Sequence, residues 1–211
     1  MVVIGVTIAA GMLAMTAVDK RKEKEYRASE NRRHATNSLK QIGPMLIEFD
    51  SEYGQLPDAA TIPAVKDKTR TPLTLGSGSS NALFRQLLLG EYGSGEKPFW
   101  VRTADSPNLP DEVFTSDAKA LVKGECVYSY VAGLKASDDG ETPVVMAPLL
   151  PGKLVFDREI FNGKAMILSL DNSVRRLPIE EDGRVLVNGM DMFDPKQPFW
   201  KGKKPDVKWP E

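Results

Sequence analysis

ATNSLKQIGPMLIEFDSEY, residues 35–53, is the stretch that decides the fold. Its apolar residues recur at spacings of four, three, four, three and four, which places them on one face of a helix. We expect this face to pack on the core of its own domain; the alternative is a helix that packs against other copies of the chain. The residues expected to make this contact after Ala35 are Leu39, Ile42, Leu46, Phe49 and Tyr53.

The helix that carries this face extends in both directions from it. Pro44 cannot donate a backbone N–H, so a kink or a short break is expected there. Tyr53-Gly54-Gln55-Leu56-Pro57 supplies the glycine and proline that end a helix. Toward the N-terminus, Glu23 precedes Arg27 by four residues, the favourable order for an ion pair. We therefore expect a charged, then amphipathic helix over residues 19–57.

Residues 1–18, MVVIGVTIAAGMLAMTAV, contain no charged side chain. The run from Val2 to Val18 would form a helix of about 26 Å, against a bilayer core of about 30 Å. We expect residues 1–18 to be an uncleaved transmembrane anchor. The two alternatives are a cleaved signal peptide and a buried soluble helix, although few soluble helices of this length are uncharged on every face.

The charge of the chain is unevenly distributed. Its 211 residues include 28 Lys plus Arg and 29 Asp plus Glu, a net charge of −1. Residues 19–40 hold eight bases and four acids and are therefore +4, so the rest of the chain is −5. Near-neutrality argues against nucleic acid as a partner. The single cysteine excludes an intramolecular disulfide and a four-cysteine zinc site.

Several phrases of the sequence resemble those of type IV pilin-like and type II secretion pseudopilin-like proteins. The apolar start Val2-Val3-Ile4, the paired Arg32-Arg33 and the phrase Asn37-Ser38-Leu39-Lys40-Gln41-Ile42-Gly43 are typical of that family. So are the acidic, aromatic end of the helix over residues 48–57 and the downstream hairpin phrase over residues 167–174. The chain departs from the family in lacking the Gly-Phe-Thr-Leu-x-Glu processing motif: its fifth residue is Gly5.

The resemblance implies a protein of the bacterial inner membrane that crosses it once, with its globular domain in the periplasm or outside the cell. It also implies two partners, membrane lipid and other pilin-like subunits that pack through the N-terminal helix. The positive-inside rule conflicts with this orientation, because it would place the basic residues 20–33 in the cytoplasm. The missing glutamate argues against polymerisation into a filament but not against the anchor.

Residues 58–190 are expected to form a globular α+β domain of pilin-like fold, in which a small antiparallel sheet packs on the long helix. A short helix over residues 81–89 follows a serine cap at Ser79 or Ser80. Asp171 and Asn172 are expected to form a two-residue hairpin turn. Residues 191–211 read as a tail rich in Pro and Trp. The expected strands are 126–131, 144–147, 165–170, 173–177 and 184–187.

Little in the sequence indicates catalysis. Cys126 lies in an apolar, strand-like run and is expected to be buried, and His34 is expected to be solvated on the basic helix. Asp138, Asp139 and Glu141 are weak candidates for binding calcium, because they offer oxygen ligands without the spacing of a calcium loop. We expect no cofactor and no enzymatic activity. The leading hypothesis is a membrane-anchored structural subunit; the alternative is a monomeric anchored module that binds a polypeptide or glycan.

Overall fold

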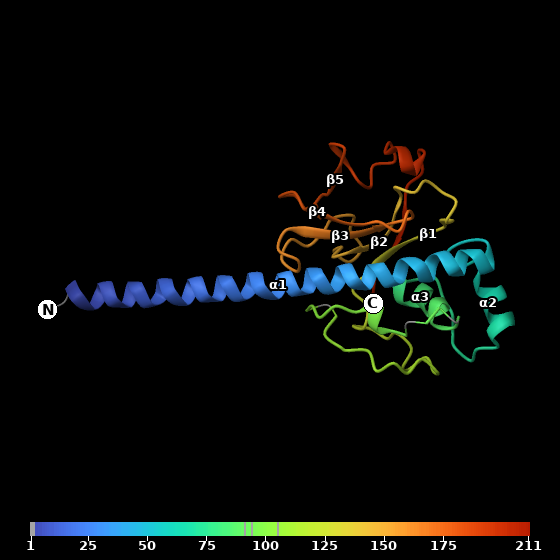
Figure 1. Ribbon diagram of the computed structural model, residues 1–211, viewed down its shortest axis with the longest axis horizontal. Coiled ribbons are helices and arrows are strands. Elements are labelled where there is room, and N and C mark those ends of the chain that lie inside the picture. The colour runs from blue at the N-terminus through green and yellow to red at the C-terminus, as the bar shows by residue number, and fades with distance from the viewer. Residues whose placement is uncertain (1–2, 91, 94, 105) are drawn as a thin grey trace.

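The computed structural model describes residues 3–90, 92–93, 95–104 and 106–211, with side chains described from residue 19 onward. It is an α+β fold, as the sequence predicts: one long helix crosses beneath a five-stranded antiparallel sheet (Figure 1). The elements are α1 (Val3–Tyr53), α2 (Ile62–Thr69), α3 (Ser80–Leu88), η1 (Lys97–Phe99), β1 (Ser129–Ala132), β2 (Pro143–Ala147), β3 (Lys164–Ser169), β4 (Val174–Pro178), β5 (Leu186–Val187), β6 (Met190–Asp191), η2 (Pro198–Trp200) and β7 (Asp206–Lys208).

Helix α1 is a single element of 51 residues. It continues through Pro44 without the short break that the sequence suggests. Pro44 is exposed on the outer side of the helix, so the carbonyl that loses its hydrogen bond can be satisfied by water. The helix ends as expected at Gly54, which has a φ of +78° and donates its N–H to the Asp50 carbonyl at 2.7 Å.

The main sheet has the strand order β4-β3-β2-β1-β7, and both of its faces are buried. Side chains alternate along the strands, so Tyr130 and Leu168 face α1 while Val131 and Ile167 face the opposite way. The sequence predicts only the first of these two cores. The second forms because the C-terminal segment folds back over the sheet, where its Phe193, Phe199 and Trp200 join Phe156 from the connection between β2 and β3 on the outer face.

Strand β7 also comes from the segment that reads as a tail. It pairs antiparallel with β1, in a register that places Val131 opposite Val207. A run of three residues between lysines and prolines is too short to give a strand pattern, so the sequence does not reveal it. The expected strand at 184–187 is shortened to β5 and pairs with β6 in a separate two-stranded sheet.

The connection between β3 and β4 contains Asp171 and Asn172, but it is one residue longer than the two-residue turn expected. Ser169 and Ser173 are joined by a backbone hydrogen bond of 3.0 Å, which leaves three residues in the loop. Asn172 adopts a φ of +65°, and Asp171 Oδ1 accepts the Ser173 N–H at 2.9 Å. A three-residue loop with a left-handed last residue is a common hairpin connection.

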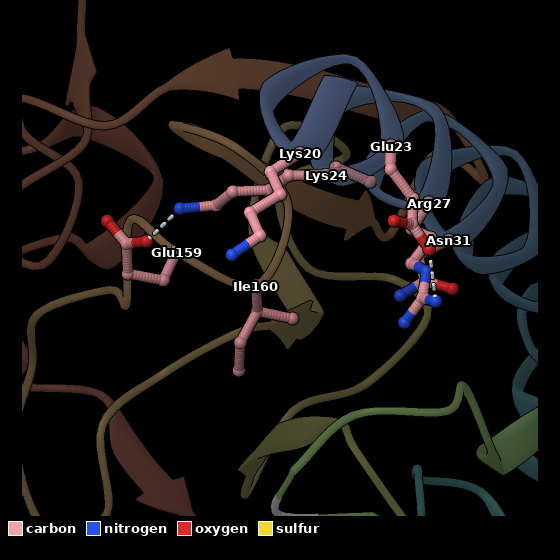
Figure 2. A pocket seen from close by; sticks show the side chains of 8 residues that line it. Lys20, Glu23, Lys24, Arg27, Asn31, Glu159 and Ile160 are labelled. Carbon is pink, nitrogen blue, oxygen red and sulfur yellow. Dashed lines mark hydrogen bonds and ion pairs between the residues drawn. The ribbon is translucent and has the colours of Figure 1, made fainter. Parts of the chain in front are cut away.

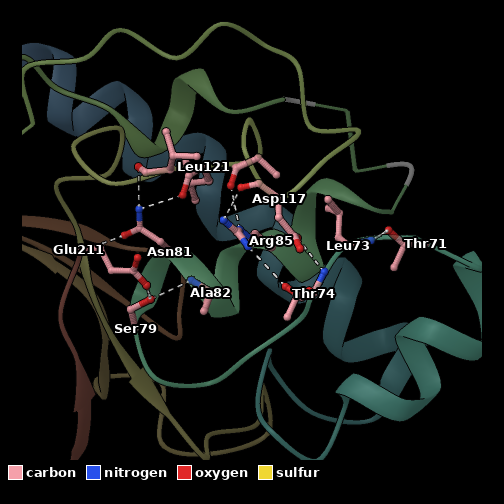
Figure 3. A network of polar contacts seen from close by, with 12 residues as sticks. Thr71, Leu73, Thr74, Ser79, Asn81, Ala82, Arg85, Asp117, Leu121 and Glu211 are labelled. Carbon is pink, nitrogen blue, oxygen red and sulfur yellow. Dashed lines mark hydrogen bonds and ion pairs between the residues drawn. The ribbon is translucent and has the colours of Figure 1, made fainter.

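Helix α3 begins after Ser79, whose hydroxyl accepts the Ala82 N–H at 3.1 Å, as the sequence predicts. Figure 3 shows how this helix holds irregular segments around it. Asn81 donates to the carbonyls of Leu121 at 3.0 Å and of Val122 at 3.1 Å, and it accepts the Glu211 N–H at 3.1 Å. One buried amide therefore fixes both the loop before β1 and the last residue of the chain.

The apolar face of α1 gives a direct test of the core. We expect Phe49→Ala to lower the free energy of unfolding by about 3–5 kcal/mol, because Phe49 is fully buried and its removal leaves a cavity. The matched control is Ile47→Ala on the same helix, which is 42% exposed and should change stability by less than about 0.5 kcal/mol. Urea unfolding followed by tryptophan fluorescence measures both; equal losses would contradict the packing described.

Candidate functional site

The most prominent feature of the molecule is the half of α1 that extends away from the domain (Figure 1). The anchor expected at residues 1–18 lies outside the residues whose side chains are described. Over the part of the chain that the structure does describe, none of the helices is long and apolar enough to cross a bilayer. The anchor accordingly remains a prediction from the sequence.

The other half of α1 is packed into the domain through the expected face. Leu39, Ile42, Leu46 and Phe49 are buried, and Tyr53 is half-buried with its ring centroid 4.5 Å from that of Phe49. The buried face begins earlier than the apolar pattern suggests and also includes Ala28, Ser38 and Met45. Small residues such as Ala28 carry a weak pattern signal although they permit close approach. In this half of the helix, the contact is with the domain's own core.

Four of the eight bases of the segment 19–40 form ion pairs with acids among the described residues. Arg27 pairs with Glu23 at 2.5 Å, and Lys24 pairs with Glu159 in the loop before β3. Arg32 is the most buried of the paired bases: it contacts Glu25 at 2.9 Å and donates to the Phe161 carbonyl at 3.0 Å. Its hydrogen bond holds the pKa of Glu25 below the usual value. The contacts of Lys24 with Glu159 and of Arg32 with Phe161 attach the helix to the loop at the point where it leaves the domain.

A cleft of about 340 Å³ lies at this point, and we call it the junction cleft (Figure 2). One wall is the basic part of α1 and the other is the loop that carries Glu159 and Ile160. In Figure 2 the amino groups of Lys20 and Lys24 extend toward this loop. The α1 wall consists of Lys20, Glu23, Lys24, Arg27, Ala28 and Asn31. The sequence shows the bases, but it does not show that a loop some 130 residues later faces them.

A larger cleft, of about 780 Å³, lies where the C-terminal segment meets the loops around β1 and β2. Its lining is mainly apolar and rich in proline, and includes Pro107, Val127, Leu149, Pro151 and Pro210. Lys123 and Glu211 also line it. Such a surface can accept an extended apolar ligand.

The two side chains considered for nucleophilic or acid–base chemistry are poorly placed for it. Cys126 is buried, and its thiol lies 3.6 Å from the Tyr128 carbonyl oxygen. Burial raises the pKa of Cys126 to about 12, so the thiol stays protonated at neutral pH. His34 is exposed on the basic helix, as expected; its ring lies edge-on to Trp100 with centroids 5.8 Å apart, and partial desolvation by this packing lowers its pKa.

The calcium candidates form turns in the loop between β1 and β2. Asp138 accepts the Lys135 N–H at 2.9 Å, and Asp139 accepts the Glu141 N–H at 3.0 Å. Across the described residues, no three His, Cys, Asp or Glu side chains are grouped in a way that could hold a metal ion. The geometry gives these carboxylates a role in shaping the turn and adds no support for calcium.

One buried acid, Glu96, could not be identified from the sequence. Glu96 is fully buried, and its Oε1 accepts the Leu121 N–H at 2.5 Å, at a residue whose φ is +41°. Its Oε2 has no hydrogen-bond partner among the described residues. Burial is the main cause that raises its pKa, and the nearby carboxylate of Glu125 adds to the effect. Glu96 follows Gly93 and Gly95 and precedes Lys97 in the sequence, where nothing indicates burial.

The described geometry therefore offers three features for interpretation: a projecting helix, a charged cleft at its base and an apolar cleft on the domain. Comparison of the chain with protein-family models, with characterised proteins and with known structures finds no match. The functional interpretation rests on the residues themselves.

Glu96 makes the stability of the domain depend on pH in an uncommon direction. An acid whose pKa is raised by folding stabilises the fold most below its unfolded pKa, and this contribution is lost as pH rises toward the folded pKa. Glu96→Gln carries no charge at any pH. We expect the variant to gain stability relative to the parent as pH rises from 4.5 to 8, measured by urea unfolding. A difference that stays constant with pH would contradict the buried carboxyl group.

Proposed function

We propose that this chain is a non-enzymatic, membrane-anchored, pilin-like structural protein, a subunit of an assembly related to type II secretion or type IV pili. The observation that carries the proposal is the continuity of α1. An uncharged run of 18 residues passes without a break into the helix that holds the domain together. One rigid element would thus connect the bilayer to the sheet.

The division of α1 into two halves supports the same proposal. The half from Ala28 onward buries its inner face on the domain, so it is not available to other copies of the chain. The half that extends away from the domain is free of this constraint (Figure 1). Its sequence places small residues at Gly5, Ala9 and Ala14, and small residues allow helices to approach closely in a bilayer. Assembly would therefore run through the N-terminal half.

We place the chain in the bacterial inner membrane with its domain in the periplasm or outside the cell. The acids that pair with Lys24 and Arg27 do not remove the conflict with the positive-inside rule, because acids contribute little to it. The placement follows from the family resemblance. Labelling of a Ser137→Cys variant with a membrane-impermeant maleimide in spheroplasts tests it, since Ser137 is exposed on the domain.

The anchor is tested by fractionation. We expect the full chain to stay with bacterial membranes through extraction with alkaline carbonate, and a chain beginning at Asp19 to be released, because the uncharged run supplies the apolar surface that the bilayer needs. Intact mass of the membrane-bound protein separates an anchor from a cleaved signal peptide. Release of the full chain would overturn the proposal.

Assembly is tested by crosslinking in intact cells. Cysteines placed at Ala9 and Ala14 should give ladders of oligomers on oxidation if N-terminal helices pack side by side. The parent chain is the matched control, since its Cys126 is buried with a pKa of about 12 and should not react. Ser137→Cys on the exposed loop reports random collision. Ladders from the loop variant alone would argue against assembly through α1.

The second candidate function is a monomeric anchored module that binds a polypeptide or glycan. The apolar, proline-rich cleft of about 780 Å³ is the observation that favours it. Crosslinking separates the two functions, because a chain that stays monomeric with cysteines at both Ala9 and Ala14 would support the binding module over the structural subunit.

A further inference from the structure

We propose that the junction cleft binds the phosphate group of an anionic phospholipid. The inference rests on the proposed membrane anchor, and it assigns a ligand to the point where α1 leaves the domain. Its first support is the arrangement of donors. Lys20, Lys24, Arg27 and Asn31 are separated by four, three and four residues, so they lie on one face of α1. All four line the cleft.

This donor face is an extension of the face that forms the core. Further along the same side of α1, the buried positions are occupied by Ala28 and Ala35, which pack on the domain. At the junction cleft, long cationic side chains take these positions instead. The amino groups of Lys20 and Lys24 extend toward the loop that carries Glu159 and Ile160, while Arg27 lies beside Glu23 on the helix wall (Figure 2). Two walls thus face each other, with cationic groups between them.

The charges of the cleft leave room for an anion. Three cations and two carboxylates line it, so its formal charge is +1. The pairs Lys24–Glu159 and Arg27–Glu23 are exposed to solvent and can exchange partners easily. Lys20 makes no ion pair within the described part of the chain. A phosphodiester would bring one negative charge to three donors, and an arginine can bind two of its oxygens at once.

The position of the cleft identifies the source of the phosphate. Lys20 follows the uncharged run 1–18 by only two residues, so an inserted anchor would hold the cleft at the level of the lipid headgroups. Ile160 and Ala28 add an apolar surface beside the donors. That apolar surface can contact the glycerol and acyl region of a lipid, whereas free phosphate has no apolar part to contact it.

The test measures lipid bound to the full chain in neutral detergent micelles, counted by native mass spectrometry. Phosphatidylglycerol should bind in preference to phosphatidylcholine. Lys20→Gln with Lys24→Gln should weaken binding of phosphatidylglycerol by at least about tenfold, since both amino groups line the cleft and each would lose a charge-assisted hydrogen bond to the phosphate. Arg21→Gln with Lys22→Gln removes the same charge at the same depth from residues outside the cleft, and should weaken it by less than about threefold.

Three results would overturn the proposal. Equal losses in the two variants would show general attraction to charge rather than a site. Equal binding of the two lipids would show that the headgroup is not recognised. Competition by inorganic phosphate at concentrations equal to those of the lipid would make free phosphate the ligand. Carbonate extraction of the same proteins keeps the anchor separate: a chain released from membranes overturns the proposed function, whereas a retained chain without lipid preference overturns only the cleft.

Discussion

Burial of one face of α1 between Ala28 and Phe49 is the contact on which the rest of the structure depends. The sheet turns its inner face to this helix, and α3 packs on the same core from the other side. Tyr128 donates its hydroxyl to the carbonyl of Ala35 at 3.4 Å, so the helix backbone is also tied to the sheet. Since the strands and α3 bury their apolar residues on α1, removing the helix would expose both.

Two of the segments that resemble pilin-like sequences meet at this helix. Gly43 belongs to the phrase in the first half of the chain and Asn172 to the hairpin phrase about 130 residues later. The two are in contact: a side chain added at Gly43 would meet the carboxamide of Asn172 and lie 3.4 Å from Leu168. A glycine at this point lets the hairpin lie close to the helix. This contact is a physical reason for the two segments to occur in the same chain, and the reason holds whatever family they resemble.

The sequence predicted those parts of the fold in which apolar residues recur over enough positions to identify a helix or a strand. The face from Leu39 to Phe49 spans three helical turns, and the runs that became β2, β3 and β4 alternate or stay apolar over several residues. Strand β7 and the second core could not be predicted in this way, because Phe156 and Trp200 are scattered and meet only through the path of the chain. The same holds for the site: its bases are visible in the sequence, but the loop at Glu159 is not.

If residues 1–18 are inserted in a bilayer as proposed, the junction cleft lies where α1 must meet two different requirements. A helix that packs on a domain needs small or apolar residues on its inner face, as at Ala28 and Ala35, whereas a helix that leaves a bilayer passes through a layer of phosphate groups that favours cations. In the proposed arrangement Lys20 and Lys24 would lie between these two regions, since they line the cleft and follow the uncharged run closely. The ammonium group of Lys24 is held against the loop by its ion pair with Glu159. The ion pair Lys24–Glu159 would thus keep the cleft together until a stronger anion takes its place.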